Sequence, residues 1–63
     1  MNIRNLLHYI KEHYNVHEII IKKVDKNYTK EYKELYAITE YMKNKKVLAY
    51  TINFLYDSLV IYI

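Results

Sequence analysis

The C-terminal third of the chain alternates between large apolar residues and other residues, and this pattern constrains the fold more than any other feature. Strict alternation is typical of a β-strand with one buried face. The large residues on that face are Leu48, Tyr50, Ile52, Phe54 and Tyr56. A tight turn at Asp57 and Ser58 would fold residues 59–63 back so that both strands share one apolar face. The opposed pairs would then be Leu59 with Tyr56, Ile61 with Phe54, and Ile63 with Ile52.

The N-terminal segment has a different period. Apolar residues recur at spacings of three and four in residues 2–14, which predicts an amphipathic helix whose inner face holds Ile3, Leu6, Leu7, Ile10 and Tyr14. Asn2 is expected to cap the start of this helix. Asn15 is expected to end it in the left-handed conformation.

Two segments complete the predicted layout. The β-branched run within Val16–Val24 predicts a strand. Residues 29–46 fit two alternatives. As a strand, Leu35, Ala37, Thr39 and Tyr41 would pair through an Asn44-Lys45 turn with the C-terminal third. As a helix, Tyr28, Leu35, Ile38 and Met42 would share one side.

These elements predict one fold class. Residues 1–63 are expected to form a single two-layer α+β domain, because a chain of this length has no room for a second one. The N-terminal helix would cover the face of Leu48, Tyr50, Ile52 and Phe54 on a small antiparallel sheet. That sheet would have three strands, or four in a meander, and would end in the C-terminal hairpin.

The residues that usually carry catalysis are scarce. The sequence contains no glycine and no cysteine, which excludes glycine-rich phosphate loops and thiol nucleophiles, and Ser58 is its only serine. His8, Glu12, His13, His17 and Glu18 are the only clustered candidates for metal ligands, but the expected end of the helix divides them. We therefore expect no enzymatic activity, no cofactor and no metal site.

Self-association is expected on grounds of size. A domain this small buries only about 60% of the surface that its unfolded chain exposes, and without cysteine no disulfide compensates. The last residues are apolar and carry no charge to protect a sheet edge. The sequence therefore predicts a homodimer that pairs through a dimer edge at Leu59, Ile61 and Ile63.

Tyrosine and lysine dominate the expected surface. Nine tyrosines are too many for the core of so small a domain, and tyrosine is enriched at protein interfaces. Lysines gather in two groups, Lys22 to Lys33 and Lys43 to Lys46, within a chain of net charge +3. The residues expected to contact a partner are Tyr28, Tyr32, Tyr62, Lys26 and Lys30.

Two functions follow as hypotheses. Ile, Lys, Asn and Tyr make up just over half of the chain, as expected of a small reading frame from the AT-rich genome of a phage or mobile element. The first hypothesis is a non-enzymatic interaction protein that binds and occludes a host complex, as an anti-defence inhibitor does. The alternative is a small basic protein that binds single-stranded nucleic acid, with lysines on phosphates and tyrosines stacked on bases.

The expected location is the cytoplasm, which is the host cytoplasm if the protein is viral. No secretory signal is recognisable in the first residues, and the absence of cysteine suits a reducing compartment. Val47–Ile63 is apolar enough to suggest a membrane anchor. It is shorter than the roughly 20 residues that a spanning helix needs and contains Asp57, so no membrane insertion is expected.

Overall fold

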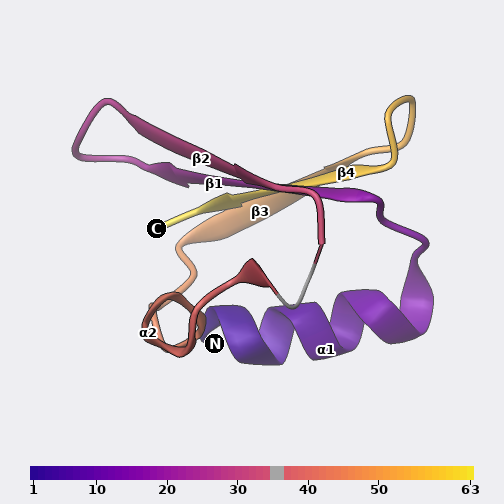
Figure 1. Cartoon of the computed structure of the whole chain (residues 1–63), viewed down its shortest axis with the longest axis horizontal. Helices are drawn as coiled ribbons and strands as arrows, with labels where there is room; N and C mark the ends of the chain where they lie inside the picture. Colours follow the sequence, from indigo (N-terminus) through magenta and orange to yellow (C-terminus); the bar gives the residue numbers. More distant parts are fainter. Residues whose placement is uncertain (35–36) are drawn as a thin grey trace.

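The computed structural model describes residues 1–34 and 37–63, and its elements follow one another along the chain as two helices and four strands. They are α1 (Ile3–His13), β1 (Glu18–Lys23), β2 (Tyr28–Tyr32), α2 (Glu40–Lys43), β3 (Ala49–Asn53) and β4 (Ser58–Tyr62). The strands form one sheet, and α1 lies across one face of it (Figure 1).

Helix α1 begins at the residue that the sequence predicts. The Asn2 side chain accepts a hydrogen bond from the Asn5 backbone N–H at 2.9 Å, and the Asn5 side chain accepts one from the Asn2 N–H at 3.2 Å. This reciprocal pair satisfies two N–H groups that the first turn would otherwise leave free. The helix ends at His13 with Tyr14 as an extended cap. The predicted left-handed Asn15 is wrong, because Asp57 alone among the described residues has a positive φ.

The cap is expected to contribute measurably to stability. Replacing Asn2 by Ala removes the acceptor for the Asn5 N–H, and we expect the free energy of unfolding to fall by about 1 kcal/mol. Urea denaturation followed by circular dichroism measures the loss. Asn15→Ala is the matched control, because Asn15 is exposed and follows the helix. Equal effects of the two substitutions would contradict the assigned role of Asn2.

Strands β1 and β2 form a hairpin across the turn at residues 24–27. The pairing sets Ile19 opposite Tyr32, Ile21 opposite Lys30 and Lys23 opposite Tyr28. The predicted strand within Val16–Val24 is confirmed as β1. Because Tyr28 lies in β2, the expected second helix does not extend back to Tyr28.

The segment after β2 ends in a single helical turn. Thr39 caps α2 by accepting a hydrogen bond from the Met42 N–H at 3.2 Å. Ile38 is buried, and Met42 packs against the core. The alternative strand through Ala37, Thr39 and Tyr41 is therefore wrong, and Leu35 lies outside the described residues. A second helix is therefore present within residues 29–46, as one alternative predicted, but it is limited to Glu40–Lys43.

The C-terminal hairpin is confirmed, but its register differs from the predicted one. Ile52 lies opposite Leu59 and Tyr50 opposite Ile61, so residues 54–57 form the turn instead of Asp57 and Ser58. The two registers differ by four residues. Because side chains alternate with a period of two, this even shift leaves the same residues on the inner face.

The order of the strands in the sheet is β2-β1-β4-β3. Each hairpin is antiparallel, but β1 and β4 pair in parallel at the centre. The predicted sheet was antiparallel throughout, and the structure corrects this to a mixed sheet. The parallel pairing sets Ile19 beside Leu59 and Ile21 beside Ile61, so the most apolar strands lie where both edges are covered.

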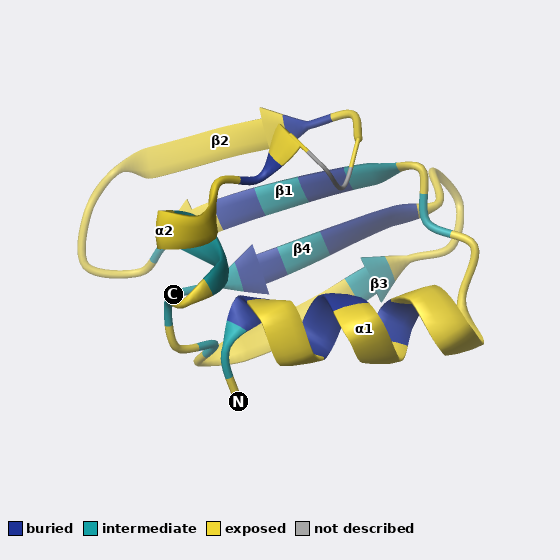
Figure 2. Ribbon diagram, turned by 60° about the horizontal axis from the view of Figure 1, so that its bottom comes forward, coloured by how far each residue is buried: buried dark blue, intermediate teal, exposed yellow. Residues whose placement is uncertain are grey.

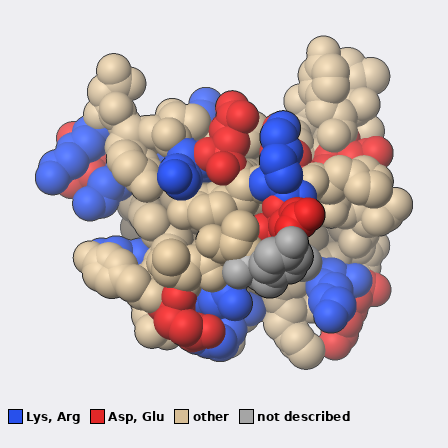
Figure 3. Space-filling model, viewed as in Figure 1, with Lys and Arg blue, Asp and Glu red and all other residues tan. Residues whose placement is uncertain are grey.

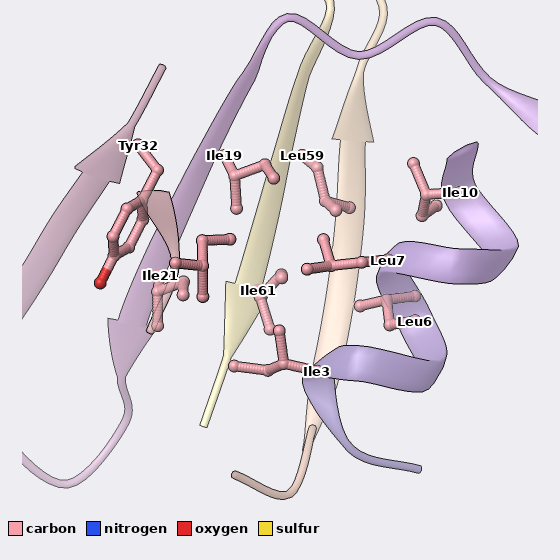
Figure 4. Packing of buried hydrophobic residues seen from close by; sticks show 10 residues of the cluster. Ile3, Leu6, Leu7, Ile10, Ile19, Ile21, Tyr32, Leu59 and Ile61 are labelled. Carbon is pink, nitrogen blue, oxygen red and sulfur yellow. The ribbon is translucent and has the colours of Figure 1, made fainter. Parts of the chain in front are cut away.

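The core lies between α1 and the two central strands (Figure 2). Ile3, Leu6 and Leu7 point from α1 toward Leu59 and Ile61 of the sheet (Figure 4). Ile21, Leu59 and Ile61 are fully buried. The expected face of β3 is only partly covered, because Leu48, Tyr50 and Phe54 stay exposed and Ile52 alone packs against the core. The two-layer α+β class with an N-terminal helix and a C-terminal hairpin is confirmed.

The apolar C-terminal segment forms β3 and β4. None of the helices that the structure describes is long and apolar enough to cross a membrane.

Candidate functional site

A hollow of about 300 Å³ opens between the β1–β2 turn and α2. Three segments that are distant in sequence line it: the end of β1 with its turn, α2 with the residues after it, and the end of β4. The lining residues are Lys23, Lys26, Tyr28, Tyr41, Met42, Lys45 and Ile63, which we call the lysine–tyrosine hollow. Figure 3 shows basic side chains at this end of the molecule, at the left, with an acidic side chain among them.

The lysines of the hollow are not neutralised by acidic side chains. In the described part of the chain, no carboxylate lies within 4.0 Å of the ammonium of Lys23, Lys26 or Lys45. Lys33 does contact Glu18, and Arg4 contacts Glu40 between α1 and α2, but other exposed lysines such as Lys22 and Lys30 also have no such contact among the described residues. The described residues that line the hollow thus include three lysines and no acidic residue, although Asp25 lies in the same turn as Lys26.

The lysines of the hollow change the pKa of the Tyr41 phenol. The Lys45 Nζ donates a hydrogen bond to the Tyr41 hydroxyl at 2.8 Å and lies 4.3 Å from the centre of its ring. The hydrogen bond lowers the pKa of the Tyr41 phenol, and the charges of Lys45 and Lys23 lower it further. The charges of Lys45 and Lys23 therefore both act on the Tyr41 side chain.

The structure brings together only some of the predicted contact residues. Lys26 and Tyr28 line the hollow. Lys30 is exposed on the same side of β2, with its Nζ 5.9 Å from the centre of the Tyr32 ring. Tyr32 is a core residue, only 9% exposed, so its expected place on the surface is wrong. Burial raises the pKa of the Tyr32 phenol, and the nearby Tyr28 adds to that shift.

Tyr62 is separated from the other predicted contacts. It follows the buried Ile61, so its side chain points to the opposite face of the sheet. Sequence reasoning did not assign Tyr41, Met42, Lys45 or Lys23 to a site, and it placed Ile63 in the dimer edge instead of this hollow. The two lysine groups were visible in the sequence, but nothing in the sequence shows that they face each other across one hollow.

The predicted dimer edge is wrong. Strand β4 lies between β1 and β3, and Leu59 and Ile61 are completely buried. Ile63 is bound to β1, because its N–H donates to the Lys22 carbonyl at 2.9 Å. The free edges are β2, which carries Lys30 and Glu31, and β3, which carries no charge. The homodimer stays a prediction, and strand addition would have to use β3.

A second surface lies at the opposite end of the molecule, where uncharged side chains project from the β3–β4 turn (Figure 3). Phe54, Leu55 and Tyr56 in this turn are 71%, 80% and 70% exposed. The Phe54 ring lies 6.0 Å from the Tyr14 ring, which lies 6.4 Å from the Tyr9 ring. These five residues form a continuous surface that we call the aromatic ridge. Tyr14 also lines a hollow of about 220 Å³ between α1 and the sheet.

The turn that carries the ridge is held at both ends. The Asn53 side chain accepts a hydrogen bond from the Leu55 N–H at 3.1 Å. Asp57 has a φ of 51°, which an aspartate tolerates better than most residues. Its carbonyl accepts a hydrogen bond of 2.7 Å from the His17 N–H, which ties the turn to the segment before β1. The exposed apolar side chains therefore project from a fixed backbone.

Two of the three histidines each lie beside one acidic side chain. His8 and Glu12 approach to 3.0 Å, and His17 and Asp57 to 4.0 Å, in both cases on the surface. Within residues 1–34 and 37–63, no three histidine, aspartate or glutamate side chains come close enough to share a metal ion.

Comparison of the chain with protein-family models, with curated proteins and with solved structures finds no match.

Proposed function

We propose that this protein is a non-enzymatic interaction protein that binds another protein through the aromatic ridge. The observation that supports this proposal is the exposure of three consecutive large apolar side chains, Phe54, Leu55 and Tyr56, at the tip of a hairpin. Leaving such a group in water is unfavourable, since burying one large apolar side chain is worth about 1.5–3 kcal/mol. Contiguous exposed apolar surface of this kind is typical of interaction sites.

The fixed backbone of the turn supports the same proposal. Ordering a loop on binding costs conformational entropy, and a loop that is already held avoids much of that cost. The hydrogen bonds of Asn53 and Asp57 hold the turn before any partner arrives. The Phe54 ring also packs beside the Tyr14 ring at the end of α1, which joins the turn to the body of the domain.

The chemistry of the ridge defines the partner. Its five members are uncharged, so we infer a partner with an apolar pocket that receives Leu55 and the aromatic rings. Binding then depends little on ionic strength. A domain this small acts by covering the surface to which it binds, which is how an inhibitor of a host complex of the anti-defence type would work. We place this interaction in the cytoplasm, which suits a chain without cysteine.

Photo-crosslinking at the ridge tests the proposal. A benzoylphenylalanine at position 56 is expected to crosslink one host protein, which is then purified and titrated with the unmodified chain. We expect a stoichiometric complex whose affinity changes little between about 0.15 M and 1 M salt. Leu55→Ser with Tyr56→Ser is expected to weaken it by about thirtyfold or more, as hot-spot residues do.

The control replaces equally exposed apolar residues elsewhere. Val24→Ser with Leu48→Ser changes side chains that are 61% and 58% exposed and lie outside the ridge. This variant is expected to bind as the unmodified chain does. If the ridge variant keeps full affinity, or if both variants lose it equally, the ridge is not the binding surface.

A further inference from the structure

The lysine–tyrosine hollow lies at the far end of the molecule from the aromatic ridge and has no part in the proposed protein interaction (Figure 1). It combines unpaired cations with aromatic rings. Lys23 and Lys45 are half-buried, whereas Lys26 is exposed on the turn. Among the described residues, no carboxylate lies within 4.0 Å of the ammonium group of Lys23 or Lys45. The positive charge of both lysines is therefore available to an anion bound in the hollow.

The two tyrosines of the hollow indicate which kind of anion would fit it. Tyr28 and Tyr41 are 39% and 67% exposed, so part of each ring is open to a ligand. An inorganic anion does not stack on aromatic rings, and it fills only a small part of a hollow of about 300 Å³. Unpaired nucleic-acid bases stack on such rings while lysines hold the neighbouring phosphates, whereas a duplex keeps its bases stacked inside.

We propose that the lysine–tyrosine hollow binds single-stranded nucleic acid, with Lys23, Lys26 and Lys45 on the phosphates and Tyr28 and Tyr41 stacked on the bases. The three lysines come from three places along the chain, the end of β1, the following turn and the segment after α2, and all three line the one hollow. Lys30 lies on the same side of β2 as Tyr28, where we expect the bound nucleic acid to leave the hollow.

The test is the fluorescence anisotropy of a labelled oligothymidylate of about 12 nucleotides, a length that a small domain can cover. Each neutralised phosphate of a single strand contributes about −0.7 to the slope of log affinity against log salt. Three lysines therefore predict a slope near −2, which is a loss of about twentyfold between 50 and 200 mM salt. A duplex of the same length is expected to bind more weakly than the single strand.

Two triple variants distinguish binding in the hollow from attraction by the overall positive charge of the chain. The hollow variant replaces Lys23, Lys26 and Lys45 by Gln, which lowers the formal net charge from +3 to 0. The control variant makes the same replacement at Lys11, Lys22 and Lys46, whose side chains are exposed outside the hollow, and lowers the charge equally. The hollow variant is expected to lose most of the binding and the salt slope, and the control to keep binding within a few-fold. Tyr28→Leu with Tyr41→Leu is expected to weaken binding at least about fivefold per ring while keeping the slope.

Several outcomes would overturn the proposal. They are absence of binding at 50 mM salt, equal losses in the two triple variants, and equal binding of duplex and single strand. Equal competition by polyaspartate at the same concentration of negative charge, or by thymidine monophosphate at the same phosphate concentration, would also overturn it. Circular dichroism checks that each variant folds. If the hollow triple variant unfolds, Lys26→Glu replaces it, because Lys26 is exposed on a turn. Binding to the crosslinked protein partner is measured on the same variants, so the two proposals fail separately.

Discussion

Replacing Ile61 by Lys is expected to unfold the domain. Ile61 has no exposed surface and lies in β4 beneath α1, between the two neighbouring strands. The substitution removes a buried isoleucine side chain and forces an ammonium group into the core, which costs several kcal/mol without a partner. A core of this size rarely supplies more than about 3–5 kcal/mol of net stability. Circular dichroism and amide exchange would show loss of the cooperative transition.

The control for this experiment is the residue directly across the sheet. Tyr50 pairs with Ile61 but lies in the edge strand β3 and is 41% exposed. Tyr50→Lys can extend its ammonium into water, and lysine is common on edge strands. We expect this variant to fold with a stability within about 1 kcal/mol of the unmodified chain. A folded Ile61→Lys variant would contradict the central position of β4.

The second prediction concerns two neighbouring isoleucines in β1. Ile21 is fully buried against α1, whereas Ile20 is half-buried on the sheet face that no described helix covers. Replacing Ile21 by Ala is expected to lower the free energy of unfolding by about 2–5 kcal/mol, because it leaves a cavity in the core. Ile20→Ala is expected to cost clearly less, since water or a side-chain shift can fill the space.

Urea titration of both variants, with the slope of the transition compared, provides the measurement. The substitution is chemically identical at the two positions, and both residues lie in the same strand. Differences in strand propensity therefore cancel, and the comparison isolates burial. If Ile20→Ala were the more damaging change, the sheet would have its other face toward the core.

The two proposed binding surfaces differ in how they could be found. Phe54, Leu55 and Tyr56 were expected inside the hairpin strand, because their alternation continues that of residues 48–52. Periodicity alone could not show that the chain turns at Asn53. The four-residue turn begins after Asn53, whose side chain accepts a hydrogen bond from the Leu55 N–H, and ends at Asp57 with its positive φ. The ridge exists because the chain turns before the alternating pattern ends.

The lysine–tyrosine hollow shows the same limit. Sequence reasoning identified Lys26 and Tyr28 as contact residues, and both line the hollow. It also placed Tyr32 on the surface, where the structure buries it opposite Ile19. A tyrosine in an alternating strand is inside or outside according to the neighbour with which its strand pairs, and that pairing is not written in the local pattern.

Local features of the sequence determined the elements whose causes are short-range. The spacing of Ile3, Leu6, Leu7 and Ile10 and the cap at Asn2 define α1. The β-branched run defines β1, and the alternation after residue 47 defines which side chains of the hairpin face inward. Each of these depends on contacts within a few residues, so each could be predicted before any strand is paired.

Tertiary structure alone decided the parallel pairing of β1 with β4, the register of the hairpin and the meeting of the two lysine groups. Registers that differ by an even number of residues present the same apolar face, so the hydrophobic pattern does not choose between them. The choice depends on which arrangement buries Ile19, Ile21, Leu59 and Ile61 together under α1. That arrangement also brings Lys23 and Lys26 to face Lys45, because the β1–β2 turn and α2 lie at the same end of the sheet.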